Sequence, residues 1–302
     1  MRASKYLVLA MLAAVPSLAL RAQERDFSQV TVNTEKVAEG VWMLSGAGGN
    51  IGVSAGEDGV FLIDDDYAPL TEKVRAAVAA ISPKPIRFLL NTHWHGDHTG
   101  GNEAHGQAGV VIVAHENVRK RMSAEQFIEA FGAKVPPSPL KALPIVTFTD
   151  VVTFHLNGDD IRSFHVPPAH TDGDTLIHFR KANVIHGGDV IFAGRYPFID
   201  LSSGGSLDGM IAAVEQVLSL CDDKTRIIPG HGPVISKVEL ARYGQVLKTA
   251  RERVGALVKQ GKTLAEVKAA RPLADHDAEW GQGFVKPDFF LDIVYKSLTS
   301  GR

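Results

Sequence analysis

The part of this sequence that most directly indicates chemistry is a tight cluster of histidines. Residues 92–99 read THWHGDHT, so three of the 12 histidines, His93, His95 and His98, fall within six positions. Asp97 lies between the last two. Imidazole and carboxylate groups together suit zinc and other borderline divalent metals. A polar turn with solvated histidines is the alternative, but surface turns seldom bring so many ligands together. We therefore predict a metal site.

The residues around the cluster indicate how it is positioned. The apolar run IRFLL precedes it and is typical of a short buried strand. The cluster would then lie at the carboxyl edge of a sheet, where open α/β folds usually keep their sites. In extended backbone His93 and His95 project to the same side. Gly96 allows a bend into a short helical segment in which Asp97 and His98 are the first side chains. The two earlier histidines can therefore hold one metal while the other pair faces a second.

The His-x-His-x-Asp-His motif after a buried strand resembles that of the metallo-β-lactamase superfamily, and further blocks match in the expected order over residues 40–235. His170 matches the third histidine of the first metal site, and His231 matches the last histidine of the second. Asp189 matches the carboxylate that bridges both metals in branches similar to glyoxalase II and the lactonases. The resemblance implies an α/β fold, the αβ/βα four-layer sandwich, as a single domain over residues 23–302.

The resemblance also implies a set of ligands for two Zn²⁺ ions, with another divalent metal such as iron as the alternative. The first ion would be held by His93, His95 and His170, the second by Asp97, His98 and His231, and both by Asp189. Two such ions about 3.5–4 Å apart can share a bridging solvent and lower its pKa toward about 7. The resulting hydroxide would attack without a serine or cysteine nucleophile. Asp97 is the predicted catalytic residue, because it could orient this hydroxide and later carry a proton.

The sequence departs from the best-known broad-spectrum β-lactamases of this superfamily. Those enzymes have a cysteine where this chain has Asp189, and a lysine three residues later that holds the substrate carboxylate. Phe192 stands in the place of that lysine. Arg195 is the nearest cation and is predicted to bind substrate in its place, with an ordinary surface charge as the alternative. Asp64, after the apolar run VFLI, matches an aspartate that braces the metal loops, with a solvated acidic turn as the alternative.

The first 22 residues have the pattern of a secretory signal peptide. Arg2 and Lys5 precede an apolar run that is too short to span a bilayer comfortably. We expect cleavage near residue 22, a periplasmic or secreted protein, and no membrane attachment afterwards. Loss of three basic residues (Arg2, Lys5, Arg21) from 32 leaves about 29 against 34 acidic residues, which argues against nucleic-acid binding. An uncleaved membrane anchor is the alternative.

The periodicity of apolar residues predicts strands and helices in two successive halves. Strands are expected at residues 41–45, 50–55 and 59–64, at 110–114, and repeatedly between 147 and 185. Helices are expected at residues 69–81 and 207–220, and after capping boxes at Ser236 and Thr263. The glycine-rich residues 45–50 and the proline-rich residues 131–144 are predicted to border the substrate pocket, with a tight turn and a plain surface connection as alternatives. The tail at residues 288–298 would pack on the core or form a dimer contact.

Other residues with chemical potential are given structural interpretations. Ser54 lies in a Gly-x-Ser-x-Gly pattern, but the strand–elbow–helix of a serine hydrolase is not expected there. Cys221 is predicted to be a core residue, with a metal ligand as the alternative. Asp172 and Asp174 are predicted to be turn residues, with partners that support the metal ligands as the alternative. The histidines without a ligand context are predicted to have structural or surface roles. They are His105, His115, His155, His165, His178, His186 and His276.

The sequence as a whole favours an exported zinc hydrolase that cleaves a carbonyl–heteroatom bond of a small-molecule substrate. Export favours a β-lactam amide or a lactone over a cytosolic thioester, and a β-lactam is the first prediction. The alternatives are a lactonase or thioesterase of the same fold, an iron-dependent oxidoreductase similar to sulfur dioxygenases, and a non-catalytic metal-binding module. The sequence does not indicate an oligomeric state.

Overall fold

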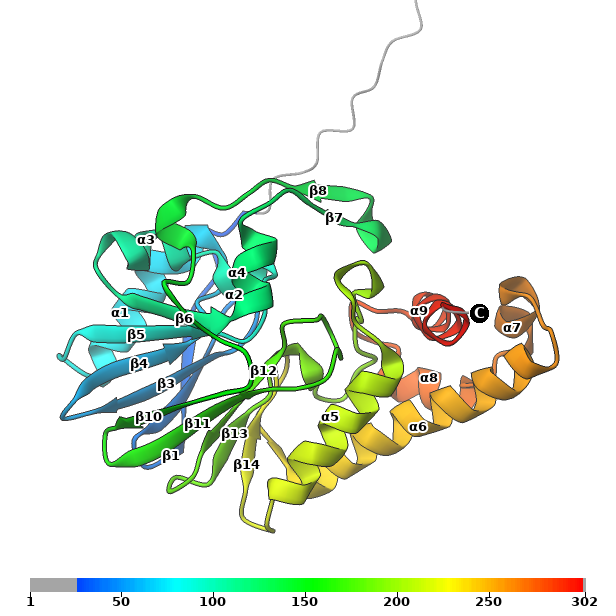
Figure 1. Ribbon diagram of the computed structural model, residues 1–302. Coiled ribbons are helices and arrows are strands. Elements are labelled where there is room, and N and C mark those ends of the chain that lie inside the picture. Colours follow the sequence, from blue (N-terminus) through cyan, green and yellow to red (C-terminus); the bar gives the residue numbers. More distant parts are fainter. Residues whose placement is uncertain (1–25, 301–302) are drawn as a thin grey trace, which may run out of the picture.

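The computed structural model describes residues 26–300 of the 302-residue chain. Two β-sheets face each other, and helices cover the outer side of each sheet (Figure 1). The predicted signal peptide, residues 1–22, lies outside the described residues. Within residues 26–300, no helix is both long enough and apolar enough to cross a membrane.

The first sheet carries the histidine cluster and has seven strands in the order β1-β2-β3-β4-β5-β6-β9. β1 to β4 are antiparallel, whereas β4, β5, β6 and β9 run parallel to one another. The strands are β1 Asn33–Ala38, β2 Val41–Ser45, β3 Ile51–Gly56, β4 Gly59–Ile63, β5 Ile86–Asn91, β6 Val111–His115 and β9 Val146–Phe148. The helices of this half are α1 Thr71–Ile81, α2 Gly96–Thr99, α3 Asn102–Gln107 and α4 Glu116–Met122.

The second sheet has six strands in the order β10-β11-β12-β13-β14-β15, of which only β13 and β14 pair in parallel. The strands are β10 Val151–Leu156, β11 Asp159–His165, β12 Thr175–Phe179, β13 Val184–His186, β14 Arg226–Ile228 and β15 Ile235–Ser236. The helices are α5 Leu207–Leu220, α6 Lys237–Lys259, α7 Leu264–Ala270, α8 Ala274–Trp280 and α9 Pro287–Thr299. A separate hairpin, β7 Gln126–Ile128 and β8 Ala133–Val135, extends above both halves (Figure 1).

The alternation of side chains along β4 explains the layered arrangement. Phe61 and Ile63 pack between the sheets with residues such as Ile177 of β12. Val60 and Leu62 point to the other face and pack with residues of α1 such as Val74. Successive side chains of a strand face opposite sides, so an entirely apolar strand must be covered on both sides. A third cluster buries α5, α6 and α9 against the second sheet, which completes the four layers.

Most predicted elements are confirmed. The three opening strands, the helix at residues 207–220 and the capping boxes at Ser236 and Thr263 are present. The helix expected from residue 69 begins at Thr71, after a 3-10 turn at Ala68–Leu70. The tail forms α9 and packs on α6 and α5, with Phe290 and Val294 buried. β1 and the hairpin β7–β8 were not predicted.

Candidate metal centre

The candidate ligands follow strands that end at the same edge of the two sheets. The histidine cluster follows β5, His170 follows β11, Asp189 follows β13 and His231 follows β14. Parallel strands end on the same side, so the β4–β5–β6 and β13–β14 pairings bring these loops together. The structure thus gathers all seven predicted ligand residues, which come from four loops: the segment after β5 and the three loops that carry His170, Asp189 and His231.

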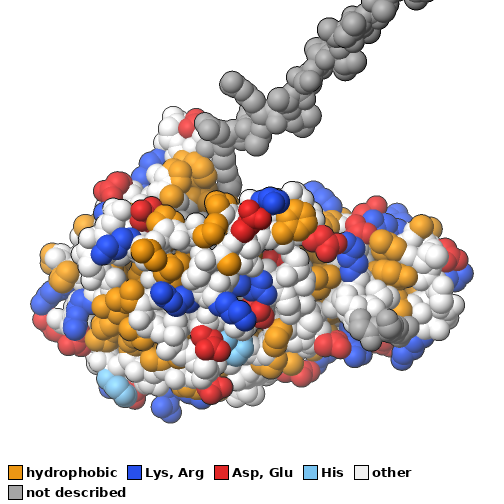
Figure 2. All heavy atoms as spheres, turned by 45° about the horizontal axis from the view of Figure 1, so that its top comes forward, with side chains coloured by type: hydrophobic (Ala, Val, Ile, Leu, Met, Phe, Trp, Pro, Cys, Tyr) orange, Lys and Arg blue, Asp and Glu red, His pale blue; other side chains and the backbone are white. Residues whose placement is uncertain are grey.

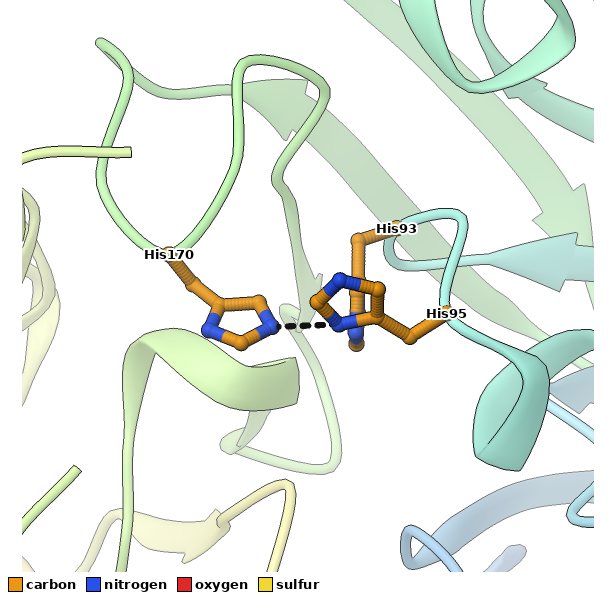
Figure 3. Close-up of side chains that lie close together, drawn as sticks. All are labelled: His93, His95 and His170. Carbon is orange, nitrogen blue, oxygen red and sulfur yellow. Dashed lines mark hydrogen bonds between the residues drawn. The ribbon is translucent and has the colours of Figure 1, made fainter. Parts of the chain in front are cut away.

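Three imidazoles form the first group. The ligand nitrogens of His93, His95 and His170 lie within 4.8 Å of one another, and all three residues are buried. His170 Nε2 lies 2.9 Å from His95 Nδ1, and the three rings converge from two separate loops (Figure 3). Nδ1 of His170 donates to the carbonyl oxygen of Phe198 at 2.8 Å. This bond places the ring hydrogen on Nδ1 and leaves the Nε2 lone pair facing the group.

Carboxylates and imidazoles form the second group. Asp97, His98 and His231 also offer ligand atoms within 4.8 Å of one another. Asp189 lies between the two groups. Its Oδ1 is 3.1 Å from His98 Nε2, and its Oδ2 is 3.3 Å from His231 Nε2 and 3.6 Å from His170 Nε2. Asp189 therefore has the position of a residue that would touch cations in both groups.

The residues fit divalent cations on two grounds. His93 Nε2, His98 Nε2 and Asp189 Oδ1 are buried polar atoms without a hydrogen-bond partner among residues 26–300, although the last two approach each other. Such atoms are costly unless something satisfies them. In addition, the ion pairs of Asp97 and Asp189 within residues 26–300 are with histidines only, never with lysine or arginine. Metal ions would coordinate the buried atoms that lack partners, and they would neutralise the negative charge of the two carboxylates.

The protonation states of the site residues also favour the binding of cations. Burial lowers the pKa of His170 to about 4 and that of His93 well below its usual range, so both imidazoles are neutral, as metal ligands must be. For His98 burial acts in the same direction, but Asp189, Asp97 and then Asp64 overcome it and raise its pKa well above normal. Burial would raise the pKa of Asp97, yet His98 and His231 lower it to about 2. A proton on His98 thus balances charge that a cation would otherwise balance.

Asp64 braces the cluster from beneath rather than lying in a solvated turn. Its side chain is fully buried and accepts hydrogen bonds at 2.7 Å from both the backbone nitrogen and the hydroxyl of Thr92. Its Oδ2 also lies 2.8 Å from His98 Nδ1. The solvated acidic turn considered for this residue is therefore wrong. The contact orients the ring so that Nε2 of His98 faces the site.

Asp200 contacts a candidate ligand and was not found from the sequence. Its Oδ2 lies 3.0 Å from His95 Nε2 and accepts from Ser203 Oγ at 2.6 Å. Ser203 in turn accepts from the indole nitrogen of Trp94 at 3.1 Å. The only local signal was a short capping pattern, in which Asp200 accepts from the backbone of Ser203. That pattern does not indicate contact with a histidine 105 positions earlier.

Asp174 and Asp172 differ in what they do. Asp174 is buried, and one of its oxygens accepts from the backbone nitrogens of His170 and Thr171, at 2.6 and 2.9 Å. Burial raises the pKa of Asp174 to about 7, although these hydrogen bonds act to lower it. Asp174 thereby holds the loop that presents His170, a role beyond that of a turn residue. Asp172 instead pairs through both oxygens with Arg121.

A cavity of about 570 Å³ opens beside the two groups. Its polar lining includes His95, Asp97, Asp189 and His231, and much of the rest is aromatic or aliphatic. Arg195 lines the cavity; its Nε donates to the carbonyl of Ala193 at 3.3 Å, and it has no acidic partner within residues 26–300.

Both predicted rim segments reach this region. Ala47 lines the cavity from the glycine-rich loop, which is held to the site by the bond from Gly49 N to Asp97 O at 3.0 Å. A Cβ at position 49 would lie 2.1 Å from His98 Cε1, so close packing requires glycine there. Phe131 and Val135 line the cavity from the hairpin segment. The proline-rich stretch is thus part of the rim, although it includes a short strand that was not expected.

Apart from Asp174, the residues given structural interpretations that are described next behave accordingly. Ser54 lies within β3 between antiparallel neighbours, not on an elbow before a helix. Cys221 ends α5 and is buried in the core beside the second sheet. His105 is fully buried and belongs to none of the ligand groups found among the described residues, whereas His155 is exposed and pairs with Asp160.

Comparison with known proteins agrees with this geometry. The family model described as the metallo-beta-lactamase superfamily matches residues 45–231, which is more than half of the chain and spans all seven residues of the site. The chain belongs to the metallo-beta-lactamase superfamily.

Three of its curated relatives carry hydrolase names. The chain is 30% identical over 164 residues to hydroxyacylglutathione hydrolase from Nitrosococcus oceani, covering 54% of this chain and 55% of the relative. It is 24% identical over 185 residues to the probable metallo-hydrolase YqgX from Bacillus subtilis, covering 57% and 83%. The chain therefore spans about half the length of the hydroxyacylglutathione hydrolases that it matches.

Solved structures share the fold. A metallo-beta-lactamase from Pontibacter korlensis superposes with a TM-score of 0.60 at 19% identity, covering 72% of this chain and 99% of that one. The sec-alkylsulfatase Pisa1 from Pseudomonas sp. superposes with a TM-score of 0.68 at 17% identity, covering 88% and 50%. At such identities the likeness shows the fold alone, and it confirms the four-layer α/β architecture.

Proposed function

We propose that this protein is an exported, zinc-dependent hydrolase that cleaves a carbonyl–heteroatom bond, with a β-lactam amide as its first candidate substrate. The observation that carries the proposal is the convergence of seven ligand residues beside a cavity. His93, His95 and His170 would hold one cation, Asp97, His98 and His231 the second, and Asp189 both. Such a pair, when bound, supplies a water of lowered pKa and polarises the attacked carbonyl.

The chain's own residues account for the remaining requirements. Asp97 is the acidic ligand that both lines the cavity and keeps part of its side chain exposed, at 22%. With its pKa lowered to about 2 it is ionised at neutral pH, so it can orient a water and accept its proton. Asp64 and Asp200 keep the rings of His98 and His95 turned toward the site. No serine or cysteine nucleophile is needed.

The choice of a β-lactam depends on where the protein works and on Arg195. The signal-like residues 1–22 support export, and antibiotics are met outside the inner membrane. Arg195 supplies a cation at the cavity wall that has no acidic partner among residues 26–300, and it could hold the carboxylate that lysine holds in the well-known enzymes. Both arguments choose among substrates that the same hydrolytic chemistry can cleave. They are needed because the fold alone seldom determines the substrate.

A thioester is the second candidate, because the relatives at 28 to 30% identity are named hydroxyacylglutathione hydrolases. A lactone is a further candidate acyl substrate. The iron-dependent oxidoreductase alternative would need only one metal ion with two histidines and an aspartate. Retention of Asp97, His98 and His231 in one group argues for the hydrolase.

A panel of substrates tests the proposal. A chromogenic cephalosporin, a carbapenem, an acyl-lactone and a thioester are each assayed with and without chelator. We expect chelator-sensitive hydrolysis that is fastest for a β-lactam. Turnover of the thioester alone would overturn the β-lactam assignment and keep the hydrolase. Absence of any hydrolysis by zinc-loaded protein, or hydrolysis insensitive to chelator, would contradict the proposal as a whole.

A further inference from the structure

Asp66 is a buried carboxylate that the proposed function does not use. It follows β4 by three positions, and its side chain is fully buried. Its Oδ1 accepts from the backbone nitrogen of Tyr67 at 2.7 Å, and its Oδ2 accepts from the backbone nitrogen of Ala47 at 3.2 Å. Burial raises the pKa of Asp66, and backbone N–H groups, including that of Gly48, oppose this shift by donating to it. The carboxylate is therefore held by the main chain.

No lysine or arginine side chain among residues 26–300 pairs with Asp66. Such side chains are spread over the surface, as Figure 2 shows for one face, whereas Asp66 lies inside. A buried charge is costly unless it is paired or hydrogen-bonded. Successive backbone N–H groups that point at one position form a nest, which is a binding site for an anion. The N–H groups of Ala47 and Gly48 are successive, so the glycine-rich loop, residues 45–50, forms a nest around Asp66.

The glycines of this loop leave room for the carboxylate. A Cβ at Gly46 would collide with Oδ2 of Asp66, and a Cβ at Gly48 would collide with its Oδ1. Glycine is the residue that lets backbone approach a ligand so closely. The loop thus encloses the carboxylate on two sides, in the way that a binding site encloses a ligand.

The same loop rests on Asp97, the predicted catalytic residue. The backbone nitrogen of Gly49 donates to the backbone oxygen of Asp97 at 3.0 Å, and a Cβ at Gly48 would lie 2.7 Å from that oxygen. Asp66 also contacts the end of α2, because its backbone oxygen accepts from the backbone nitrogen of Gly100 at 2.9 Å. α2 is the helix that carries Asp97. Asp66 therefore joins the two segments, since its side chain binds the loop and its backbone binds the helix end.

We propose that Asp66 is a positioning residue: its carboxylate is the built-in anion of the nest, and it holds the glycine-rich loop against Asp97. The inference rests on the proposed function as far as Asp97 acts in hydrolysis. It also assigns an anion site to the loop, which remains when the carboxylate is removed. Ala47 and Tyr67, whose N–H groups bind Asp66, both line the cavity, so a small anion can reach the emptied nest from there. Formate has the size of the missing carboxylate.

Asp66→Gly tests the nest in the chelator-treated full chain. Glycine removes the carboxylate and readily keeps the φ of 61° that Asp66 adopts. Backbone hydrogen exchange, followed by NMR, should be about tenfold faster at Ala47 and Gly48, because both amides lose a charged acceptor. Formate should restore slow exchange at these two amides, whereas formamide, which is neutral and of similar size, should not.

Two further variants complete this measurement. Asn183→Gly is the matched control, because Asn183 has a φ of 55° and its side chain bonds Asp222 at 2.9 Å, but it does not line the cavity. It should leave exchange at Ala47 unchanged. Asp66→Asn keeps one accepting oxygen and loses the charge, so its exchange should be intermediate. Wild-type exchange in Asp66→Gly, or equal effects of formate and formamide on it, would overturn the inference. Should the glycine variant fail to fold, wild-type exchange in Asp66→Asn would overturn it in the same way.

Kinetics separate failure of this inference from failure of the proposed function. With zinc-loaded protein and the panel substrate that the wild type hydrolyses fastest, Asp66→Gly should lower kcat about ten- to a hundredfold, because Asp97 is displaced. KM should change less. Formate, but not formamide, should restore much of the lost kcat, and neither should change the wild type or Asn183→Gly. An unchanged kcat in Asp66→Gly would overturn the positioning role. If the wild type hydrolyses no substrate but the exchange pattern holds, the proposed function fails and the nest stands.

Discussion

The Nε2 atom of His95 lies 3.0 Å from Oδ2 of Asp200, and the Nδ1 atom of the same ring faces Nε2 of His170 at 2.9 Å. The carboxylate keeps the ring hydrogen on Nε2, so Nδ1 is the nitrogen with a lone pair for the metal. Asp200 therefore determines the tautomer and the orientation of His95, although the two residues are 105 positions apart in the sequence.

Asp200→Asn should accordingly weaken metal binding by about 10–100-fold, the usual cost of losing such a partner. Affinity is measured by competition with a chromogenic chelator. Asp208→Asn is the control, because Asp208 pairs with Arg251 on the surface of α5 and does not contact the site. Equal metal affinity in both variants and the wild type would show that Asp200 does not support His95.

Replacement of Asp64 should affect folding as well as metal binding. Asp64→Ala removes the carboxylate that accepts from the backbone nitrogen and the hydroxyl of Thr92, and puts alanine at a φ of 62°. We expect a loss of about 3 kcal/mol in the free energy of unfolding, given about 1–3 kcal/mol for each unsatisfied group. Asp64→Asn should lose less, because asparagine can accept a hydrogen bond and tolerates positive φ. Urea unfolding of chelator-treated protein measures both, and equal stability of all three proteins would refute this account.

The sequence predicts those parts of the site and fold that depend on local spacing. His93, His95, Asp97 and His98 lie in one segment after an apolar run, and the structure brings them together at the end of β5. Long periodic helices and capping boxes were likewise predicted at the right residues. His170, Asp189 and His231 came only from the family resemblance, because nothing local specifies that their loops meet.

Features that depend on tertiary contact were not predictable. β1 has an exposed or half-buried pattern without clear alternation, and it forms a strand because β2 offers an edge to pair with. The hairpin β7–β8 has strands of three residues and lies in a stretch rich in proline, so local propensity argued against it. Asp200 contacts His95 only because η5, Leu201–Ser203, is placed against the first sheet's loops.

Arg195→Ala should raise KM for an anionic substrate and leave kcat nearly unchanged. Its guanidinium lines the cavity without an acidic partner in the described chain, so it is available for a carboxylate. A charge-assisted hydrogen bond contributes about 1.5–3 kcal/mol, which predicts an increase in KM of roughly ten- to a hundredfold. Steady-state kinetics measure the split, and Arg195→Lys should restore part of the loss. An unchanged KM would make Arg195 an ordinary surface charge.

Acid should destabilise the protein partly through His105. This residue is fully buried, and both ring nitrogens lack hydrogen-bond partners in the described part of the chain. Burial, followed by the charge of Arg75, lowers its pKa from 6.5 to about 4. Between these pH values the unfolded chain takes up a proton that the folded chain does not, so stability falls as pH falls from 6.5 to 4. The contribution lost by pH 4 is about 3 kcal/mol.

The difference between wild type and His105→Leu isolates this contribution. Unfolding free energies of chelator-treated proteins are compared at pH 7 and pH 4.5, and the variant should show the shallower decline. His155→Leu is the matched control for the loss of a histidine, because His155 is 77% exposed. Identical pH dependence of the wild type and His105→Leu would contradict the assignment.

The central claim is that seven side chains on four loops hold two cations, and elemental analysis of metal content per chain tests it most directly. After zinc loading and removal of free metal, the wild type and His155→Ala should each contain about two zinc ions per chain, as expected for a two-metal centre. His231→Ala, which loses a ligand of the second group only, should retain about one. Metal-free wild-type protein after the same treatment, or the same stoichiometry in His231→Ala as in the wild type, would contradict the account.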